Sequence, residues 1–482
     1  MFELLFIKSI LIMKVLILLL LSYISTILTD KLLFAFSFTR NGARTPLHLS
    51  QSKKDIFGEQ WFGEAELTKV GKRQQYLLGY YLHLRYMQYK LLLSEIYEPR
   101  EVYFSSTEFN RTLQSAYAQI HGIYQKGVLL NEKQKKNAIP PNTLINYSKE
   151  KEALGDYSLP NNMMIAPVHT FYEKEHAFEL QREENCKGIK EYTKSKHNEK
   201  VVKDLREEIV NSFGEGLIKL IKTEDGSTVD KETLKSNVTL FNEVIDSFLS
   251  EYINEYEAMM KKFTDAGIDI ETLYNKALEY NKLLAFGSFY IKEYSNSTLK
   301  EEEKTIAKIA STSTSQMLLN WMKMRMDYNK KGDDAKKSYE APKYVDYIAI
   351  HSSLDVFNLF INEALSLSSF SPSSFSSSAL VELFLNEESK EYYVNYTIDD
   401  KEITKIKYSD FESSIKRAMK TSNEINAYCG IEENKAQSFN YFILSSIGSG
   451  LLFVGLLVFV VIYAFNRNKH SYEILEKSIL KQ

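Results

Sequence analysis

Two arginines near the N-terminus are spaced to bind an oxyanion. Arg40 and Arg44 lie in the stretch Arg-Asn-Gly-Ala-Arg-Thr-Pro, directly after an apolar run that ends at Phe38. Guanidinium groups bind phosphate oxygens through paired hydrogen bonds. Asn41 stands between the arginines; its amide can donate a hydrogen bond to phosphate but has no basic lone pair with which to attack phosphorus. The stretch predicts a phosphate-binding loop at a strand end whose central residue is not a nucleophile.

This loop resembles the signature of the histidine acid phosphatases, the family of the prostatic and lysosomal acid phosphatases. In that family the position of Asn41 holds a nucleophilic histidine. Segments at residues 66–74, 105–112, 167–170 and 349–352 resemble further family elements in the same order. The resemblance covers roughly residues 31–430. Because five chance matches in order are improbable, we interpret the chain as a relative of this family.

The resemblance implies a mechanism and assigns positions to it. A histidine attacks phosphorus, an arginine cluster holds the phosphoryl oxygens, and an aspartic acid protonates the leaving oxygen. Arg111 corresponds to a third phosphate-binding arginine and His351 to a pocket histidine, whereas Ser352 stands at the position of the aspartate. A hydroxyl is a poor general acid, and losing that acid costs about 10² to 10⁴ in rate. We therefore expect a pseudophosphatase that keeps a phosphate-binding pocket of Arg40, Arg44, Arg111 and His351.

Two other functions stay open. An active acid phosphatase that hydrolyses phosphate monoesters would need a substitute nucleophile, for which His48 or an aspartate formed by deamidation of Asn41-Gly42 are candidates. Asp355 is a substitute proton donor if the segment after His351 is helical. A structural or adhesive glycoprotein with a vestigial pocket is the third possibility. His169 corresponds to a family residue near the site that is not the nucleophile.

The hydrophobic pattern predicts an α/β fold. Apolar runs at residues 33–39, 102–105 and 344–350 predict strands that end at three candidate site segments, and an open α/β sheet binds ligands at the carboxyl ends of its strands. We expect a central mixed sheet flanked by helices, with an inserted, mostly helical cap, as the resemblance also implies. Further predicted elements are a helix through residues 238–248, a serine-rich loop at 366–378, paired strands at 380–385 and 392–398, and a helix at 411–419.

Both ends of the chain indicate a membrane protein. Residues 15–21 form an apolar run with Lys8 and Lys14 before it, which is typical of a signal peptide. Residues 441–465 carry no charge and would span about 37 Å as a helix, enough to cross a bilayer. Arg467 and Lys469 follow, so the positive-inside rule predicts a type I orientation.

We therefore expect a signal peptide at residues 1–29, an α/β phosphatase-like domain at 30–172 and 341–430, a helical cap at 173–340, a stalk at 431–440, a transmembrane helix at 441–465 and a cytosolic tail at 466–482.

The tail contains Tyr472 and, three residues on, Leu475. This arrangement resembles the tyrosine-based signals that sorting adaptors bind, although such short patterns arise often by chance. It favours an endosomal or lysosomal location, with the cell surface as the alternative.

The two cysteines, Cys186 and Cys429, predict one disulfide in an oxidising lumen, and they resemble a pair in the family. Lumenal exposure makes glycosylation possible at the sequons of Asn110, Asn146, Asn237, Asn296 and Asn395, although we expect the first to be unused beside Arg111.

The formal charge of −3 with mixed signs provides no basic field for nucleic acid. No spacing indicates a metal site, and we expect no cofactor. Family members often dimerise, so a homodimer is possible.

Overall fold

The structure is a computed structural model that describes residues 30–141, 146–170, 186–196, 200–286, 301–331, 342–349, 351–367 and 373–431. The predicted signal peptide, transmembrane helix and cytosolic tail lie outside these residues, as does the stalk beyond residue 431. Within the described ranges, no helix is both long and apolar enough to cross a membrane.

A seven-stranded mixed sheet forms the centre of the fold, in the order β3-β2-β4-β1-β5-β6-β7. The strands β3, β2, β4 and β1 are parallel to one another, and β5, β6 and β7 continue the sheet in antiparallel pairing. Their bounds are β1 (Asp30–Arg40), β2 (Val102–Ser106), β3 (Val168–Thr170), β4 (Tyr344–Ala349), β5 (Ser378–Asn386), β6 (Tyr392–Ile398) and β7 (Lys401–Lys407). The predicted mixed sheet is confirmed, as is the pairing of β5 with β6.

Strand β1 is central and is buried on both faces, which explains its almost unbroken apolar sequence. Phe34, Phe36 and Phe38 alternate onto one face and join the larger of the two cores of the sheet. Ala35, which faces the other way, joins the second core.

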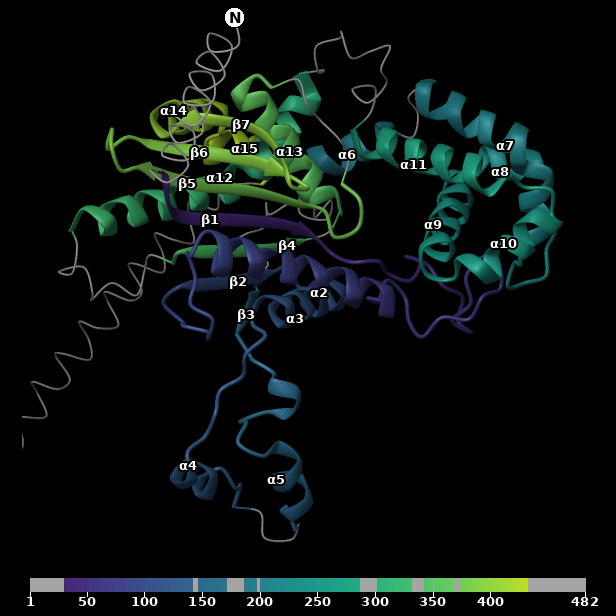
Figure 1. Cartoon of the computed structure of the whole chain (residues 1–482). Helices are drawn as coiled ribbons and strands as arrows, with labels where there is room; N and C mark the ends of the chain where they lie inside the picture. The colour runs from purple at the N-terminus through teal and green to yellow at the C-terminus, as the bar shows by residue number, and fades with distance from the viewer. Residues whose placement is uncertain are drawn as a thin grey trace, which may run out of the picture. The chain divides into compact units, whose positions relative to one another are not determined.

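Helices cover both faces of the sheet (Figure 1). On one face lie α2 (Lys69–His83) and α3 (Asn110–Ile123), and on the other α12 (Glu301–Lys331), α13 (His351–Leu365) and α14 (Tyr408–Ala418). Helix α12 falls in the range expected for the cap, yet it packs on the sheet, because Leu318 and Met322 are buried against the phenylalanines of β1.

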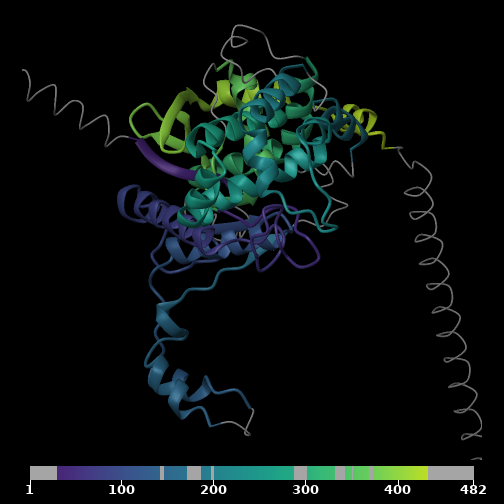
Figure 2. The ribbon, with the colours of Figure 1, turned by 90° about the vertical axis from the view of Figure 1, so that its right-hand side faces the viewer.

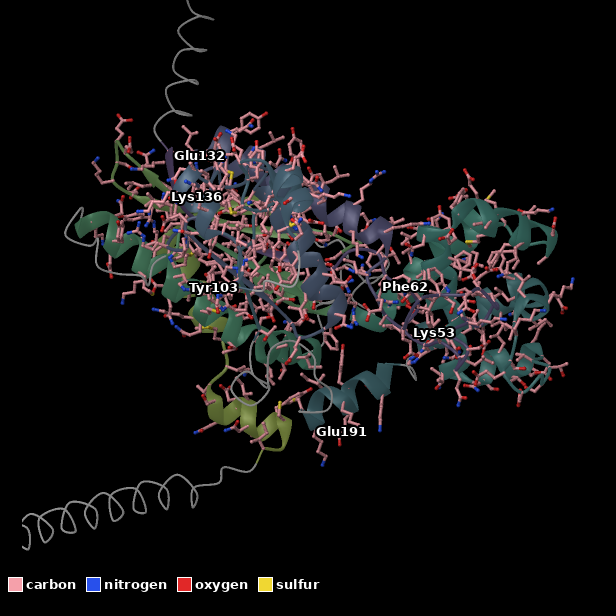
Figure 3. All side chains as sticks on the ribbon, turned by 90° about the horizontal axis from the view of Figure 1, so that it is seen from below. Lys53, Phe62, Tyr103, Glu132, Lys136 and Glu191 are labelled. Carbon is pink, nitrogen blue, oxygen red and sulfur yellow. The ribbon has the colours of Figure 1, made fainter. Side chains whose placement is uncertain are left out.

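The cap is a bundle of helices with its own apolar core, drawn in teal in Figures 1 and 2. Its members are α7 (Lys200–Leu220), α8 (Lys231–Ser236), α9 (Val238–Asn254), α10 (Tyr256–Asp265) and α11 (Ile270–Phe286). The predicted helix through residues 238–248 is α9. The loop between β1 and α2 inserts Ile56 and Phe57 into the cap core. Figure 3 labels Lys53 and Phe62 on this loop, beside the cap helices.

The other described elements are short. They are a π-helix (Leu84–Tyr89), α4 (Glu132–Asn137), α5 (Ser148–Leu154), a 3₁₀ turn (Pro160–Asn162), α6 (Lys187–Lys196) and α15 (Ser422–Cys429), the last in a separate unit that begins at Ser422. Both cysteines are disulfide-bonded, and since the chain has two, Cys186 pairs with Cys429. The predicted disulfide is confirmed.

One predicted glycosylation site is wrong. Asn395 lies in β6 between two neighbouring strands and is only 7% exposed. The next two residues of its sequon are buried as well, so a glycan cannot be accommodated in the folded sheet. The sequon of Asn296 lies outside the described residues.

Candidate anion-binding site

Three neighbouring strands end at the same side of the sheet and bring the candidate residues together. Strand β1 ends at Arg40, which pairs in register with Ala349 at the end of β4. Strand β2 lies on the other side of β4 and leads into α3, whose second residue is Arg111. His351 and Ser352 begin α13, and their side chains are outside the described residues.

The loop after β1 is held in place by α2 and by the turn that precedes it. Thr68 caps α2 by accepting a hydrogen bond from Gly71, and its own backbone N–H donates to the carbonyl of Ala43. The Gln74 side chain accepts from the Ala43 backbone N–H at 2.9 Å. The Gln75 side chain donates to the carbonyl of Arg40 at 2.7 Å. The segment at residues 66–74, which resembles a family element, and the adjoining Gln75 therefore support the loop.

Two glycines allow the loop and α2 to touch. A Cβ atom at Gly71 would lie 2.1 Å from the Ala43 carbonyl oxygen, and one at Gly42 would lie 2.4 Å from the Gly71 carbonyl oxygen. No larger residue fits without moving backbone, so this close approach explains both glycines.

Arg40 contacts the described end of the serine-rich loop, which begins at Ser373 and leads into β5. Its Nη1 donates to the Ser373 carbonyl oxygen at 2.6 Å, and its guanidinium lies 4.0 Å from the centre of the Phe375 ring. Burial, with a smaller contribution from the charge of Arg44, lowers the pKa of Arg40 to about 9 against the opposing charge of Asp355. Arg40 therefore still carries its charge at neutral and acidic pH.

Arg44 forms an ion pair with the cap. Its Nη2 and Nη1 donate to the two carboxylate oxygens of Asp246 on α9, at 2.7 and 3.2 Å. The Nη1 atom also donates to the Thr45 carbonyl oxygen, and the Leu47 backbone N–H donates to the same carboxylate at 2.7 Å. The side chain of Asn254, at the end of α9, donates to the Arg44 carbonyl oxygen. The second arginine of the loop thus connects the sheet with the cap.

Arg111 completes a group of three cations. Its guanidinium lies 4.5 Å from the centre of the Phe109 ring and makes no hydrogen bond to any residue that the structure describes. Burial, together with the charge of Arg44, lowers the pKa of Arg111 to about 10. Arg44 therefore lies within electrostatic range of both Arg40 and Arg111.

Asn41 is buried between these arginines. Its side-chain amide donates to the Gly42 carbonyl oxygen at 2.8 Å, and the Gly42 backbone N–H is directed at the Ser115 hydroxyl of α3 at 3.2 Å. Deamidation requires that backbone nitrogen to attack the Asn41 side chain, and both groups are otherwise engaged. These hydrogen bonds therefore disfavour deamidation of Asn41 to aspartate.

The other candidates lie in different surroundings. His48 is exposed on the loop after β1, and its charge acts on Glu243 of the cap. His169 lies on strand β3, where its ring stacks on Tyr103 with the ring centres 4.6 Å apart. Asp355 is buried in α13 and accepts hydrogen bonds from the backbone N–H and the hydroxyl of Ser373 at 2.8 and 2.5 Å.

Burial raises the pKa of Asp355 to about 7, against the opposing hydrogen bonds of Ser373 and the charge of Arg40. The carboxyl is therefore protonated in an acidic compartment and hydrogen-bonded to the residue whose carbonyl oxygen binds Arg40.

Sequence reasoning missed the contribution of the cap. Asp246 and Tyr274 both act on the pKa of Arg40, so α9 and α11 face the cation group. No sequence motif includes Asp246, and from the sequence it is one of several polar residues on an amphipathic helix. Only the tertiary fold brings it next to Arg44. Among the described residues, no cluster of histidine, cysteine, aspartate and glutamate side chains could hold a metal ion.

The chain is similar to known phosphatases. The model of the histidine phosphatase superfamily (branch 2) matches residues 23–399. Testicular acid phosphatase of Mus musculus is 42% identical over 96 residues, which are 19% of this chain and 22% of the relative. Lysosomal acid phosphatase of Xenopus laevis is 36% identical over 111 residues, 23% of this chain and 24% of the relative. The apo form of the Hafnia alvei phytase aligns with a TM-score of 0.48 and 12% identity, over 82% of this chain and 98% of the phytase.

The aligned segments span less than a quarter of the length of these two acid phosphatases, whereas the family match extends from before β1 into the turn after β6. By that match, the chain belongs to branch 2 of the histidine phosphatase superfamily.

Proposed function

We propose that this protein is a catalytically impaired, type I membrane histidine acid phosphatase that binds phosphate monoesters or similar small anions without efficient hydrolysis. The observation that carries the proposal is that Arg44 lies within electrostatic range of both Arg40 and Arg111. The sequence resemblance implies that Asn41, which is buried, stands at the position of the family's nucleophile.

Binding is favoured by the charge and surroundings of this group. Burial depresses the pKa of both Arg40 and Arg111, which means that part of their hydration is lost. A dianion compensates for that loss through charge-assisted hydrogen bonds. His351, which begins α13 at the end of the adjacent strand, is a further proposed ligand of the anion.

Turnover is disfavoured at two positions. The Asn41 amide is hydrogen-bonded to the next carbonyl group and has no lone pair for attack on phosphorus. The sequence resemblance implies that Ser352 stands at the position of the family's proton donor, and a serine hydroxyl hardly ionises near neutral pH.

The location follows from segments outside the described residues. We propose that residues 441–465 anchor the domain with its bulk in the lumen or outside the cell, and that Tyr472 and Leu475 bind sorting adaptors. The lysosomal acid phosphatase among the relatives supports an endosomal or lysosomal address.

An active acid phosphatase is the second candidate, and one observation favours it. Asp355 lies one helical turn after Ser352 and has a pKa of about 7, so it is a protonated acid at the pH of an acidic compartment. A substitute nucleophile would still be needed: His48 is exposed on the loop after β1, and the ring of His169 stacks on Tyr103.

Thermal protection by inorganic phosphate tests the binding proposal. We expect phosphate to raise the melting temperature of the purified full-length chain, since a ligand that binds only the folded state stabilises it by about 2.7 kcal/mol at one hundred times its Kd. The Arg40→Ala variant should lose this protection, whereas Arg73→Ala, which removes an exposed arginine of α2, should keep it. Equal protection of all three proteins, or protection of none, would contradict the proposal.

A further inference from the structure

The Asp246 carboxylate occupies donor groups of the kind that a bound anion uses. It accepts hydrogen bonds from Nη1 and Nη2 of Arg44 and from the backbone N–H of Leu47. A paired guanidinium edge with an adjacent backbone N–H is a typical arrangement for holding phosphate oxygens. In this structure the cap itself supplies the anion.

The ion pair with Asp246 leaves the Nη1–Nη2 edge of the Arg44 guanidinium few hydrogen-bond donors for a second anion. Nη1 donates both to Asp246 and to the Thr45 carbonyl oxygen, so its two hydrogens are used, and Nη2 donates once to Asp246. The side chains of Arg44 and Asp246 are only 13% and 19% exposed, so water screens the pair weakly.

The charge of Asp246 also reaches the other two arginines. It raises the pKa of both Arg40 and Arg111, against the lowering effect of burial. The carboxylate is thus positioned as a fourth charge of the anion site, and it reduces the attraction that the three arginines exert on a ligand.

We infer that Asp246 is a built-in counter-anion that sets the affinity and charge preference of the site. This inference rests on the proposed anion-binding function. An anion that takes the Arg44 edge must replace the Asp246 carboxylate, and any anion that binds near it experiences its repulsion. Removal of the carboxylate should therefore tighten binding, and should do so more for a dianion than for a monoanion, because the repulsion is proportional to the ligand charge.

The test compares sulfate, which carries two negative charges near neutral pH, with methanesulfonate, which carries one. Both Kd values are measured by titration calorimetry on the full-length chain in the native form and as Asp246→Asn, which keeps the side-chain shape, and Asp246→Ala. Asp265→Asn is the matched control, since Asp265 is an exposed carboxylate of the same cap. Melting temperatures without ligand establish that each variant is folded.

We expect both Asp246 variants to bind sulfate about tenfold more tightly and methanesulfonate about threefold more tightly, with no change for the control. If the native chain binds sulfate and the folded Asp246 variants bind it equally or more weakly, Asp246 only holds Arg44 in place, and the inference is overturned while the proposed function stands. If no protein binds either anion, the anion-binding function itself fails, and the inference fails with it.

Discussion

The two sides of the site differ in charge and in the way they are held. The sheet side contributes Arg40, Arg44 and Arg111 from the ends of β1 and β2, whereas the cap side contributes Asp246 and, beyond it, Glu243. We therefore expect the sheet side to attract an anion and the cap side to oppose its binding. On the proposed function, Asn41 removes the nucleophile and leaves the means of binding in place, while Asp246 of the cap reduces the strength of binding.

The attachment of the two sides also differs. The loop after β1 is fixed by hydrogen bonds of its backbone to Thr68, Gln74 and Gln75, none of which depends on the side chain at position 41. The cap reaches this loop near Arg44 through the side chains of Asp246 and Asn254. These backbone hydrogen bonds are therefore compatible with either asparagine or histidine at position 41.

The largest expected effect comes from restoring the family residues on the sheet side. The Asn41→His, Ser352→Asp double variant should hydrolyse p-nitrophenyl phosphate at least about 10² times faster than the native chain, because it regains a nucleophile and a general acid. Steady-state rates at about pH 5 measure this. The same double variant with Arg40→Ala added is the control and should be inactive. A folded double variant without activity would show that the sheet side has lost more than these two groups.

A smaller effect is expected when the loop is forced away from α2. Gly71→Ala places a Cβ atom 2.1 Å from the Ala43 carbonyl oxygen, so we expect a loss of about 1 to 3 kcal/mol in the free energy of unfolding. Phosphate protection should weaken with it, because Ala43 directly precedes Arg44. Lys72→Ala, on the exposed surface of the same helix, should change stability by less than about 0.5 kcal/mol. Equal stability of the two variants in urea unfolding would contradict the close approach.

Buried carboxyl groups on the sheet side and in the cap should make the free energy of unfolding depend on pH. Burial raises the pKa of Asp355 to about 7 and of Asp346 on β4 to about 8, and in the cap it raises the pKa of Glu251 to about 9. Each of these groups keeps its proton in the folded chain at a pH where the unfolded chain has released it. Stability should therefore fall as the pH rises above about 5, by about 1.4 kcal/mol per pH unit for each group until its folded pKa is reached.

Urea unfolding between about pH 5 and pH 9 measures this slope. Glu251→Gln should remove the part of this loss of stability that comes from the cap and continues up to about pH 9. Asp346→Asn should remove a part that comes from β4 and ends near pH 8. Stability that stays level or rises over the range would show that these carboxyls are ionised in the folded chain.

The sheet and its strand ends were predictable because their signals are local. Strands β1, β2 and β4 follow from short apolar runs, and the three arginines lie within a few residues of strand ends. The role of Thr68, Gly71 and Gln74 in supporting the loop was visible only as a motif, since its hydrogen bonds join residues about thirty positions apart. Helix α12 and Asp246 could not be assigned, because an amphipathic helix does not reveal which surface its apolar face covers or which partner its polar residues meet.

The most direct test of the account is hydrolysis of p-nitrophenyl phosphate by the native full-length chain across about pH 4 to 7, beside an Arg40→Ala, Arg44→Ala control. The account predicts no hydrolysis above that of the control, because the arginines remain but Asn41 cannot attack phosphorus. Hydrolysis by the native chain that disappears in the control would contradict it, and would mean that a substitute nucleophile works beside the arginines.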